Sequence, residues 1–208
     1  MFGYAEITIA EAIVSLNTGL NPRQNFKLNE EGSALPYITG KDVYGNTINV
    51  TDRTDRINQQ TVNLINRRAK IENDDVMFVS TGTGTVGRMA IVENYHNDWA
   101  VSETMFMLKP NSKLVVPKYL MFCLTATQAK KQYEPKISKG SVPHLKVSDL
   151  LKVRIQIPII SKQTELVDRI SCLDKLCNDI TEGLPAEIEA RRQQYEYYRD
   201  KLLTFKEI

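Results

Sequence analysis

The feature that most restricts the fold of this chain is a helical pattern that fills its last third. Apolar residues recur there at spacings of four and three, the a/d pattern of a helix that packs along a second helix. The stripe comprises Leu166, Ile170, Leu173, Cys177 and Ile180, and it resumes, displaced by one residue, as Ile188, Tyr195, Tyr198, Leu202 and Phe205. Gly183 and Pro185 stand at the displacement, where a glycine can end one helix and a proline can begin the next. The pattern predicts two helical segments within residues 159–208, with Ser161 as the N-cap of the first.

The length of this region predicts that it projects from the rest of the molecule. Roughly 45 nearly continuous helical residues would span about 60 Å, which exceeds the width of a compact domain of this size. Residues 1–158 have the length of one domain carried on that projection. The alternative, two amphipathic helices that cover a globular core, stays open.

The composition is that of a cytoplasmic protein with one core. The chain has 208 residues, 42 % of them hydrophobic, and we find neither a signal peptide nor an apolar run long enough to span a membrane. Its three cysteines, Cys123, Cys172 and Cys177, lack metal-ligand spacing and two lie at or near an apolar stripe. We therefore expect buried thiols, no metal site and no association with membranes.

Positive charge is concentrated in one part of the chain. The net charge is only +2, but Lys109–Lys146 holds eight lysines and a single acidic residue, Glu134, whereas residues 151–208 hold ten basic and ten acidic residues. This division suits a phosphate-facing body attached to a protein-binding stalk. A solvated run of lysines is the alternative.

Short elements are predicted along the body. Thr8 and Glu11 form a capping box that begins a helix, and Gly19 is placed to end it. Pro117 stands at the start of another helix. Strands are expected at residues 35–38, 75–80, 88–92, 99–108 and 153–157, a turn at 42–46 and a short helix at 147–151. Residues 51–70 show no periodicity strong enough to predict an element.

The glycines at 82, 84 and 87 match the G-x-G-x-x-G fingerprint, and Glu103 follows about 20 residues later. A nucleotide-binding enzyme therefore has to be considered. That fingerprint requires a helix to open at the third glycine, whereas Arg88–Val92 is typical of a strand that ends in a turn. The pattern favours a glycine-rich hairpin between two strands.

Several stretches together resemble the DNA-sequence specificity subunit of type I restriction-modification enzymes. In the body these are the glycine-rich hairpin Thr81–Arg88, the loop residues Gly140, Ser141, Pro143 and Leu145, then Ser148–Leu150 and Ile155–Pro158. In the last third they are Gln163, Leu173–Asp174, Gly183–Ile188 and Gln194–Arg199. The resemblance implies an α+β fold, in which a mixed α/β target recognition domain (residues 1–158) precedes an antiparallel coiled-coil spacer (residues 159–208).

The same resemblance implies a subunit without chemistry of its own and without a cofactor. Its body would read one half-site in double-stranded DNA, while its helices would set the spacing and dock methyltransferase and restriction subunits. Such subunits usually carry two recognition domains and two spacers, and this chain has one of each, so a homodimer and a bipartite, palindromic target are expected. The two helical stripes would form the seam of that dimer. A coiled-coil adaptor without DNA affinity is the alternative.

Candidate DNA contacts follow from side-chain chemistry and from the loops in which the residues lie. Lysines position phosphates, whereas hydroxyl, imidazole and guanidinium groups contact bases or backbone. The phosphate candidates are Lys130, Lys131, Lys136 and Lys139; the others are Thr81, Thr83, Arg88, Ser138, Ser141 and His144, with Arg53, Arg56, Arg67 and Arg68 as a second set.

Overall fold

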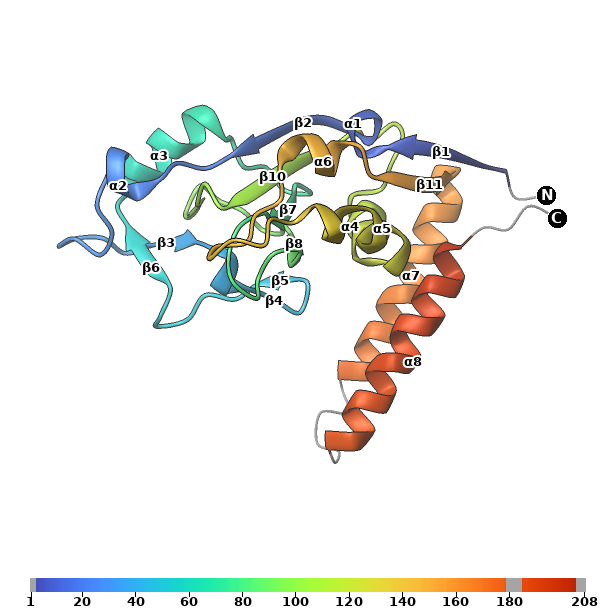
Figure 1. Ribbon diagram of the computed structural model, residues 1–208. Helices are drawn as coiled ribbons and strands as arrows, with labels where there is room; N and C mark the ends of the chain where they lie inside the picture. The colour runs from blue at the N-terminus through green and yellow to red at the C-terminus, as the bar shows by residue number, and fades with distance from the viewer. Residues whose placement is uncertain (1–2, 179–184, 205–208) are drawn as a thin grey trace.

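A mixed α/β body and a pair of long helices make up the protein (Figure 1). The computed structural model describes residues 3–178 and 185–204. The long helices are α7 (Ile160–Asn178) and α8 (Pro185–Leu203). The α+β fold class predicted from the sequence is confirmed. Among the described helices, none combines the length and the hydropathy needed to cross a membrane.

The centre of the body is an antiparallel four-stranded sheet in the order β2–β10–β7–β8. Its strands are β2 (Ile13–Thr18), β10 (Met105–Pro110), β7 (Val76–Val79) and β8 (Met89–Ile91). Because successive side chains of a strand point to opposite faces, Phe78 joins the core beneath α4 (Pro117–Thr125), whereas Met77 joins a second apolar cluster on the other face. The predicted strands at 75–80 and 88–92 are thus confirmed, and burial on both faces explains why β7 is apolar at every position.

Residues 51–70, for which no element was predicted, contribute to a second sheet in the order β6–β3–β9 and to the helix that packs on it. The sheet comprises β6 (Asp55–Ile57), β3 (Leu35–Ile38) and β9 (Ala100–Val101), and α3 (Gln59–Arg68) packs on it through Val62 and Ile65. Helix α3 buries only Thr61, Val62 and Ile65, and this stripe is too short to stand out in a polar sequence. The predicted strand at 35–38 is confirmed. Nearby lie α2 (Pro22–Asn25), the 3₁₀ turn Gly40–Asp42 and the hairpin β4 (Val43–Tyr44) and β5 (Thr47–Ile48), which encloses the predicted turn.

The N-terminal helix is much shorter than predicted. The capping box is present, since Oε2 of Glu11 accepts from the backbone N of Thr8 at 2.7 Å and Oγ1 of Thr8 accepts from the N of Glu11 at 3.3 Å. Helix α1 (Ile9–Ala12) then ends after one turn, and residues 13–18 form β2 against β10, so the helix predicted to reach Gly19 is wrong. Gly19 is required for close approach: a Cβ there would collide with the carbonyl of Val101.

The start of the body lies beside the strand that leads into the long helices. Strand β1 (Tyr4–Thr8) pairs antiparallel with β11 (Arg154–Pro158). Between β10 and β11 come α4, α5 (Thr127–Tyr133), the 3₁₀ turn Glu134–Lys136 and α6 (Val147–Leu151). The predictions of a helix from Pro117, a short helix at 147–151 and a strand at 153–157 are confirmed. The strand predicted at 99–108 is divided into β9 and β10 by a turn.

Helices α7 and α8 run side by side in opposite directions, as the orange and red ribbons of Figure 1 show. The two-segment prediction and the helix start at Pro185 are confirmed. The expectation of one projection about 60 Å long is wrong, because two helices of 19 residues each, about 28 Å long, lie next to one another. Their packing begins inside the body, where Leu166, Ile170 and Leu203 belong to the core.

The residues of the predicted seam fall into several environments. Leu166 and Ile170 are buried within the chain, Leu173, Tyr195 and Leu202 are half-buried, and Tyr198 is 44 % exposed. Ile180 and Phe205 lie outside the described residues, as do the side chains of Cys177 and Ile188 on α7 and α8. Their role in a dimer stays a prediction.

Two smaller predictions about α7 and its surroundings are wrong. Helix α7 starts at Ile160, which places Ser161 inside its first turn and not at the N-cap. Cys123 is buried, as expected for a residue on the core face of α4, but Cys172 is exposed on α7.

Candidate nucleic-acid interface

Two loops that are some fifty residues apart in the sequence lie side by side at one end of the four-stranded sheet. The first, residues 81–88, is the glycine-rich loop between β7 and β8; the second, residues 136–145, is the lysine-containing loop before α6. Thr81 and His144 form an antiparallel bridge. On either side of it, the N of Gly82 donates to the carbonyl of Pro143 at 3.0 Å and the N of Leu145 donates to the carbonyl of Ser80 at 2.8 Å. The fold therefore joins both loops into one surface.

The lysine-containing loop is fastened by a pair of its own side chains. Oγ of Ser138 lies 2.8 Å from Nδ1 of His144 and accepts from the backbone N of His144 at 3.0 Å. The N of Ser138 donates to the carbonyl of His144 at 2.9 Å. These bonds tie residue 138 to residue 144 across the loop. Both side chains, predicted as DNA contacts, are therefore engaged in holding the loop's shape.

The glycine-rich loop uses backbone conformations that other residues rarely adopt. Gly82, Gly84 and Gly87 have φ of +139°, +70° and +87°. At Gly87 the backbone approaches Tyr133 of α5 so closely that a Cβ would lie 3.3 Å from the tyrosine hydroxyl. Strand β8 starts two residues later, at Met89, where a dinucleotide-binding loop would need a helix. The predicted hairpin is confirmed. The helix that a nucleotide-binding loop needs after its third glycine is absent, because strand β8 occupies that place.

The tips of the two loops carry exposed polar and cationic groups. Thr83, Lys136, Lys139 and Ser141 are all exposed. Within the described part of the chain, neither lysine forms an ion pair with a carboxylate. Their charge is therefore available to an anionic partner.

A second cationic cluster lies where the body meets α8. Arg88, Lys130 and Arg199 line a hollow of about 220 Å³ together with Tyr195 and the backbone of Gly87. Arg199 is only 5 % exposed, donates to Oδ1 of Asp200 at 2.9 Å and lies over the Tyr195 ring. Partial burial alone would raise the pKa of Asp200, but hydrogen bonds from Thr127 and Arg199 outweigh burial and lower it. Arg199 thus acts within the chain, while Arg88 and Lys130 face the hollow.

The remaining predicted residues are not gathered with these loops. The guanidinium of Arg56 donates to the carbonyls of Ala34 at 3.4 Å and Thr51 at 3.3 Å, which favours a structural role. Arg53 is exposed in the turn before β6, and Lys131 is exposed on α5 beside a hollow lined by Asp200. Arg67 and Arg68 are exposed in the last turn of α3, where Arg68 donates to Oγ1 of Thr18 at 3.3 Å.

Most of the chain matches one known protein family. A model described as "Type I restriction modification DNA specificity domain" matches residues 5–190. The chain belongs to this family. The resemblance found in the sequence is thereby confirmed, and the match covers the body, α7 and the first turns of α8.

Individual relatives share the domain at low identity. The chain is 29 % identical over 181 residues to the EcoR124I/EcoR124II specificity subunit of Escherichia coli, a match that covers 84 % of this chain and 42 % of the relative. It is 32 % identical over 131 residues to a putative type I specificity subunit of Haemophilus influenzae, covering 60 % and 31 %. The chain therefore spans less than half the length of these relatives.

Solved structures show the same fold. The HsdS subunit from Thermoanaerobacter tengcongensis superimposes with a TM-score of 0.57 at 16 % identity, covering 95 % of this chain and 46 % of the other. A chain from a study of assembly and conformational transition of the type I restriction-modification system gives a TM-score of 0.60, with 97 % and 46 % covered at 16 % identity. At these identities the likeness concerns the fold alone.

Sequence reasoning missed two features of this specificity domain. The first is the burial of Arg199, which was one of many balanced charges in the last third and which no local pattern marks as buried.

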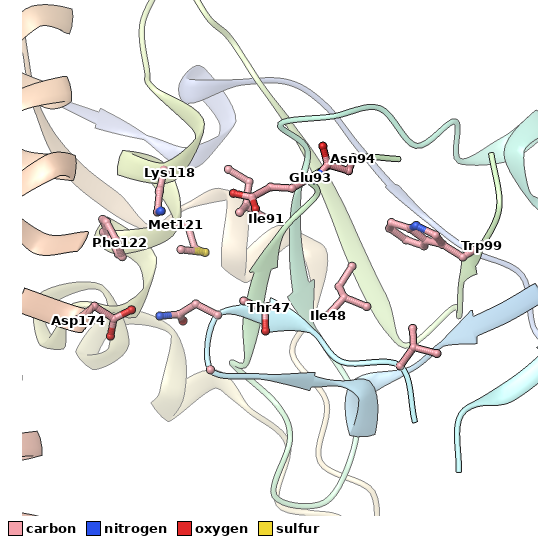
Figure 2. Close-up of a pocket in the computed structure, with 13 residues that line it drawn as sticks. Thr47, Ile48, Ile91, Glu93, Asn94, Trp99, Lys118, Met121, Phe122 and Asp174 are labelled. Carbon is pink, nitrogen blue, oxygen red and sulfur yellow. The ribbon is translucent and has the colours of Figure 1, made fainter. Parts of the chain in front are cut away.

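The second is a hollow of about 400 Å³ between the β4–β5 hairpin, α4 and α7 (Figure 2). Lys118 and Asp174 lie on one side of it and Trp99 and Ile48 on the other. Partial burial raises the pKa of Asp174, against the opposite effect of Lys118. The lining of this hollow is partly polar and partly apolar, and it contains none of the residues predicted to contact DNA.

Proposed function

We propose that this chain is the non-catalytic DNA-recognising component of a type I restriction-modification complex in the cytoplasm, and that its body reads one half-site in double-stranded DNA. The main support for this proposal is that the loops 81–88 and 136–145 are joined by backbone hydrogen bonds into one surface at one end of the four-stranded sheet. Its relatives are named specificity subunits. Both loops expose groups that suit contact with a sugar–phosphate backbone.

The charge on this surface suits a polyanion. Lys136 and Lys139 are exposed and free of ion pairs within the described residues, and exposed hydroxyls of Thr83 and Ser141 lie in the same two loops. Each lysine that neutralises a phosphate releases a condensed counterion, so the logarithm of the binding constant falls with the logarithm of salt by about 0.9 per contact. Charge on the loops should therefore appear directly in the salt dependence of binding.

The test measures binding of the full chain to duplexes selected from a random library. We expect a selected motif, and we expect Lys136→Glu with Lys139→Glu to weaken binding and to lower the salt slope by about two. Lys152→Glu, the same charge change at an exposed residue outside both loops, is the matched control. A wild-type chain that binds no duplex and selects no motif would support the coiled-coil adaptor instead.

We further propose that two copies pair through their helical hairpins and so recognise a bipartite, palindromic target. The chain covers 42 % of one relative and 46 % of two solved chains, so two copies would match their length. Leu166 and Ile170 are already buried within the chain, which leaves the outer side of the hairpin for pairing. Tyr197 and Tyr198 are 61 % and 44 % exposed there, and aromatic residues are enriched at protein interfaces.

Light scattering tests the pairing. A dimer has twice the chain mass of 23.7 kDa. We expect Tyr198→Glu to dissociate it, because a carboxylate would be buried without a partner. Gln194→Glu, at another exposed position of α8, is the control. A wild-type monomer at all concentrations would remove the symmetric target from the proposal while leaving half-site recognition intact.

The same helices are proposed to dock the methyltransferase and restriction subunits. The support is indirect: the hairpin projects from the body, and one solved neighbour comes from work on complex assembly in the type I restriction-modification system. Co-purification with a modification subunit, compared between the wild type and Tyr197→Glu, tests this part. Equal recovery of both would place the docking surface elsewhere.

A further inference from the structure

The outer face of α3 carries exposed amide, apolar and guanidinium side chains, which differ in type from the lysines and hydroxyls exposed on the two loops. Gln60, Asn63, Leu64 and Arg67 line a hollow of about 350 Å³. Their spacings of three, one and three place them on one side of a helix. The opposite side is buried, through Val62 and Ile65. The four residues, here called the α3 face, therefore point away from the body.

The chemistry of the α3 face differs from that of the loops. Arginine can pair with O6 and N7 of guanine through two hydrogen bonds, asparagine and glutamine can pair with N6 and N7 of adenine, and apolar side chains contact the thymine methyl. The loops instead expose lysines and hydroxyls, which suit phosphates. Their one arginine, Arg88, donates to the carbonyl of Val43 at 3.4 Å and lines the hollow beside α8. The groups best able to discriminate bases thus lie on α3.

The side chains of the α3 face are both oriented and available. Oδ1 of Asn63 accepts from Nε2 of Gln59 at 3.2 Å and from Nδ2 of Asn97 at 3.1 Å, which fixes the amide and occupies both lone pairs of its oxygen, so that its NH₂ group is the part that can contact a base. No side-chain hydrogen bond to another described residue engages Gln60 or Arg67. Base readout requires side chains that are held in position and still have free hydrogen-bonding groups, as the Asn63 amide and the side chains of Gln60 and Arg67 do.

Helix α3 is linked to the end of the four-stranded sheet that carries the loops. Arg68 in its last turn donates to Thr18, the last residue of β2. Thr18 pairs with Phe106 of β10, and the carbonyl of Thr104, just before β10, accepts from the N of Thr81 at 3.2 Å. The last turn of α3, at the β2 edge, and the start of the glycine-rich loop, after β7, therefore lie toward the same end of the four-stranded sheet. In Figure 1, α3 lies at the end of the body farthest from the hairpin.

We propose that α3 is the base-reading helix of this domain and lies in the major groove, with Gln60, Asn63 and Arg67 toward base edges while the two loops hold phosphates. The inference rests on the proposed DNA recognition. The helix has ten residues, about 15 Å in length, and a major groove about 12 Å wide admits a helix of this kind.

The experiment selects duplexes from a random library with the full chain, its Gln60→Ala, Asn63→Ala and Arg67→Ala variants, and Arg192→Ala on α8 as control. We expect Arg67→Ala to lose a guanine preference at one motif position by roughly 5- to 100-fold, and Gln60→Ala to lose an adenine preference. Asn63→Ala should lose a preference for a base with a major-groove acceptor, and Arg192→Ala should keep the motif. Thermal midpoints and circular dichroism establish that each variant is folded.

The possible failures are distinguishable. If the wild type selects a motif and all three α3 variants select the same motif with the same base ratios, the inference about α3 is overturned and the proposed function stands. If the wild type selects no motif, the proposed function fails and the inference fails with it.

Discussion

The side-chain carbonyl of Gln163, in the first turn of α7, accepts a hydrogen bond of 2.8 Å from the backbone N of Val116, the residue that precedes α4. Its Nε2 donates to the carbonyls of Leu114 at 2.9 Å and Pro158 at 2.8 Å. Gln163 is fully buried. One amide therefore connects the start of the hairpin to two segments of the body.

Replacing this amide should loosen the hairpin from the body. Gln163→Ala removes the partner of one donor and two acceptors, of which the bond to Pro158 is buried and the bonds to Val116 and Leu114 are part-buried. A fully buried group without a partner costs about 1–3 kcal/mol, and a part-buried group costs less because water can reach it. We expect the free energy of unfolding in urea to fall by about 2–4 kcal/mol, with Gln194→Ala, at an exposed position of α8, unchanged. A loss no greater than in that control would show that water or backbone movement replaces the three bonds.

The Ser138–His144 pair should set the shape of the second loop. Ser138→Ala removes the acceptor of the His144 amide and the partner of its ring, so we expect faster hydrogen exchange at residue 144 and weaker DNA binding, with about 1 kcal/mol lost in stability. Ser141→Ala, at an exposed position of the same loop, is the control for loss of a hydroxyl alone. Equal effects of the two variants would mean that the hydroxyls matter only as direct contacts.

Several local sequence signals predicted elements correctly because one residue type decides the backbone there. The glycines after β7 and Pro117 each restrict the chain within a few residues, and the hairpin and the helix predicted from them are present. The capping box at Thr8 is present for the same reason. Residues 13–18 form a strand because they pair with β10, about ninety residues further along the chain. A prediction from neighbouring residues alone could not include this pairing and therefore extended the helix to Gly19.

The site was less predictable because it depends on which segments meet. Sequence reasoning selected both loops, but only the fold shows that Thr81 bridges His144. It also placed Lys130 and Lys131 in one set, whereas the helix turns them toward different hollows. The antiparallel pairing of α7 with α8 within one chain likewise left no trace in the spacing of the stripe, since a partner helix from another copy would produce the same pattern.

Glu72 should make stability depend on pH in the acid range. Hydrogen bonds from Lys109 and Lys70 lower its pKa from 4.5 to about 2. Because the folded-state pKa is depressed, its stabilising contribution is present above pH 4.5 and is lost as the pH falls from 4.5 toward about 2. Glu72→Gln should flatten the decline of the urea midpoint in that window.

Glu31→Gln, at an exposed position, is the control for this pH effect. Burial raises the pKa of the neighbouring Asp75, which acts in the opposite direction, and Glu72→Gln removes only the smaller contribution that the Glu72 charge makes to this shift. Because Glu72 is half exposed, the difference between wild type and Glu72→Gln should shrink at high salt. Identical pH profiles for the wild type and Glu72→Gln at low salt would contradict the assignment.

The hollow beside α8 offers the sharpest comparison of two neighbouring lysines. Lys130 lines it with Arg88, whereas Lys131 lies beside another hollow next to Asp200. If DNA follows the glycine-rich loop to its end at Arg88, a phosphate reaches Lys130 first. We therefore expect Lys130→Glu to weaken binding of the full chain to DNA and to lower the salt slope by about one, and Lys131→Glu to change both less, as measured by fluorescence anisotropy at several salt concentrations. The reverse order would mean that the DNA passes on the Lys131 side of α5, and with it away from the hollow that Arg88 and Lys130 share.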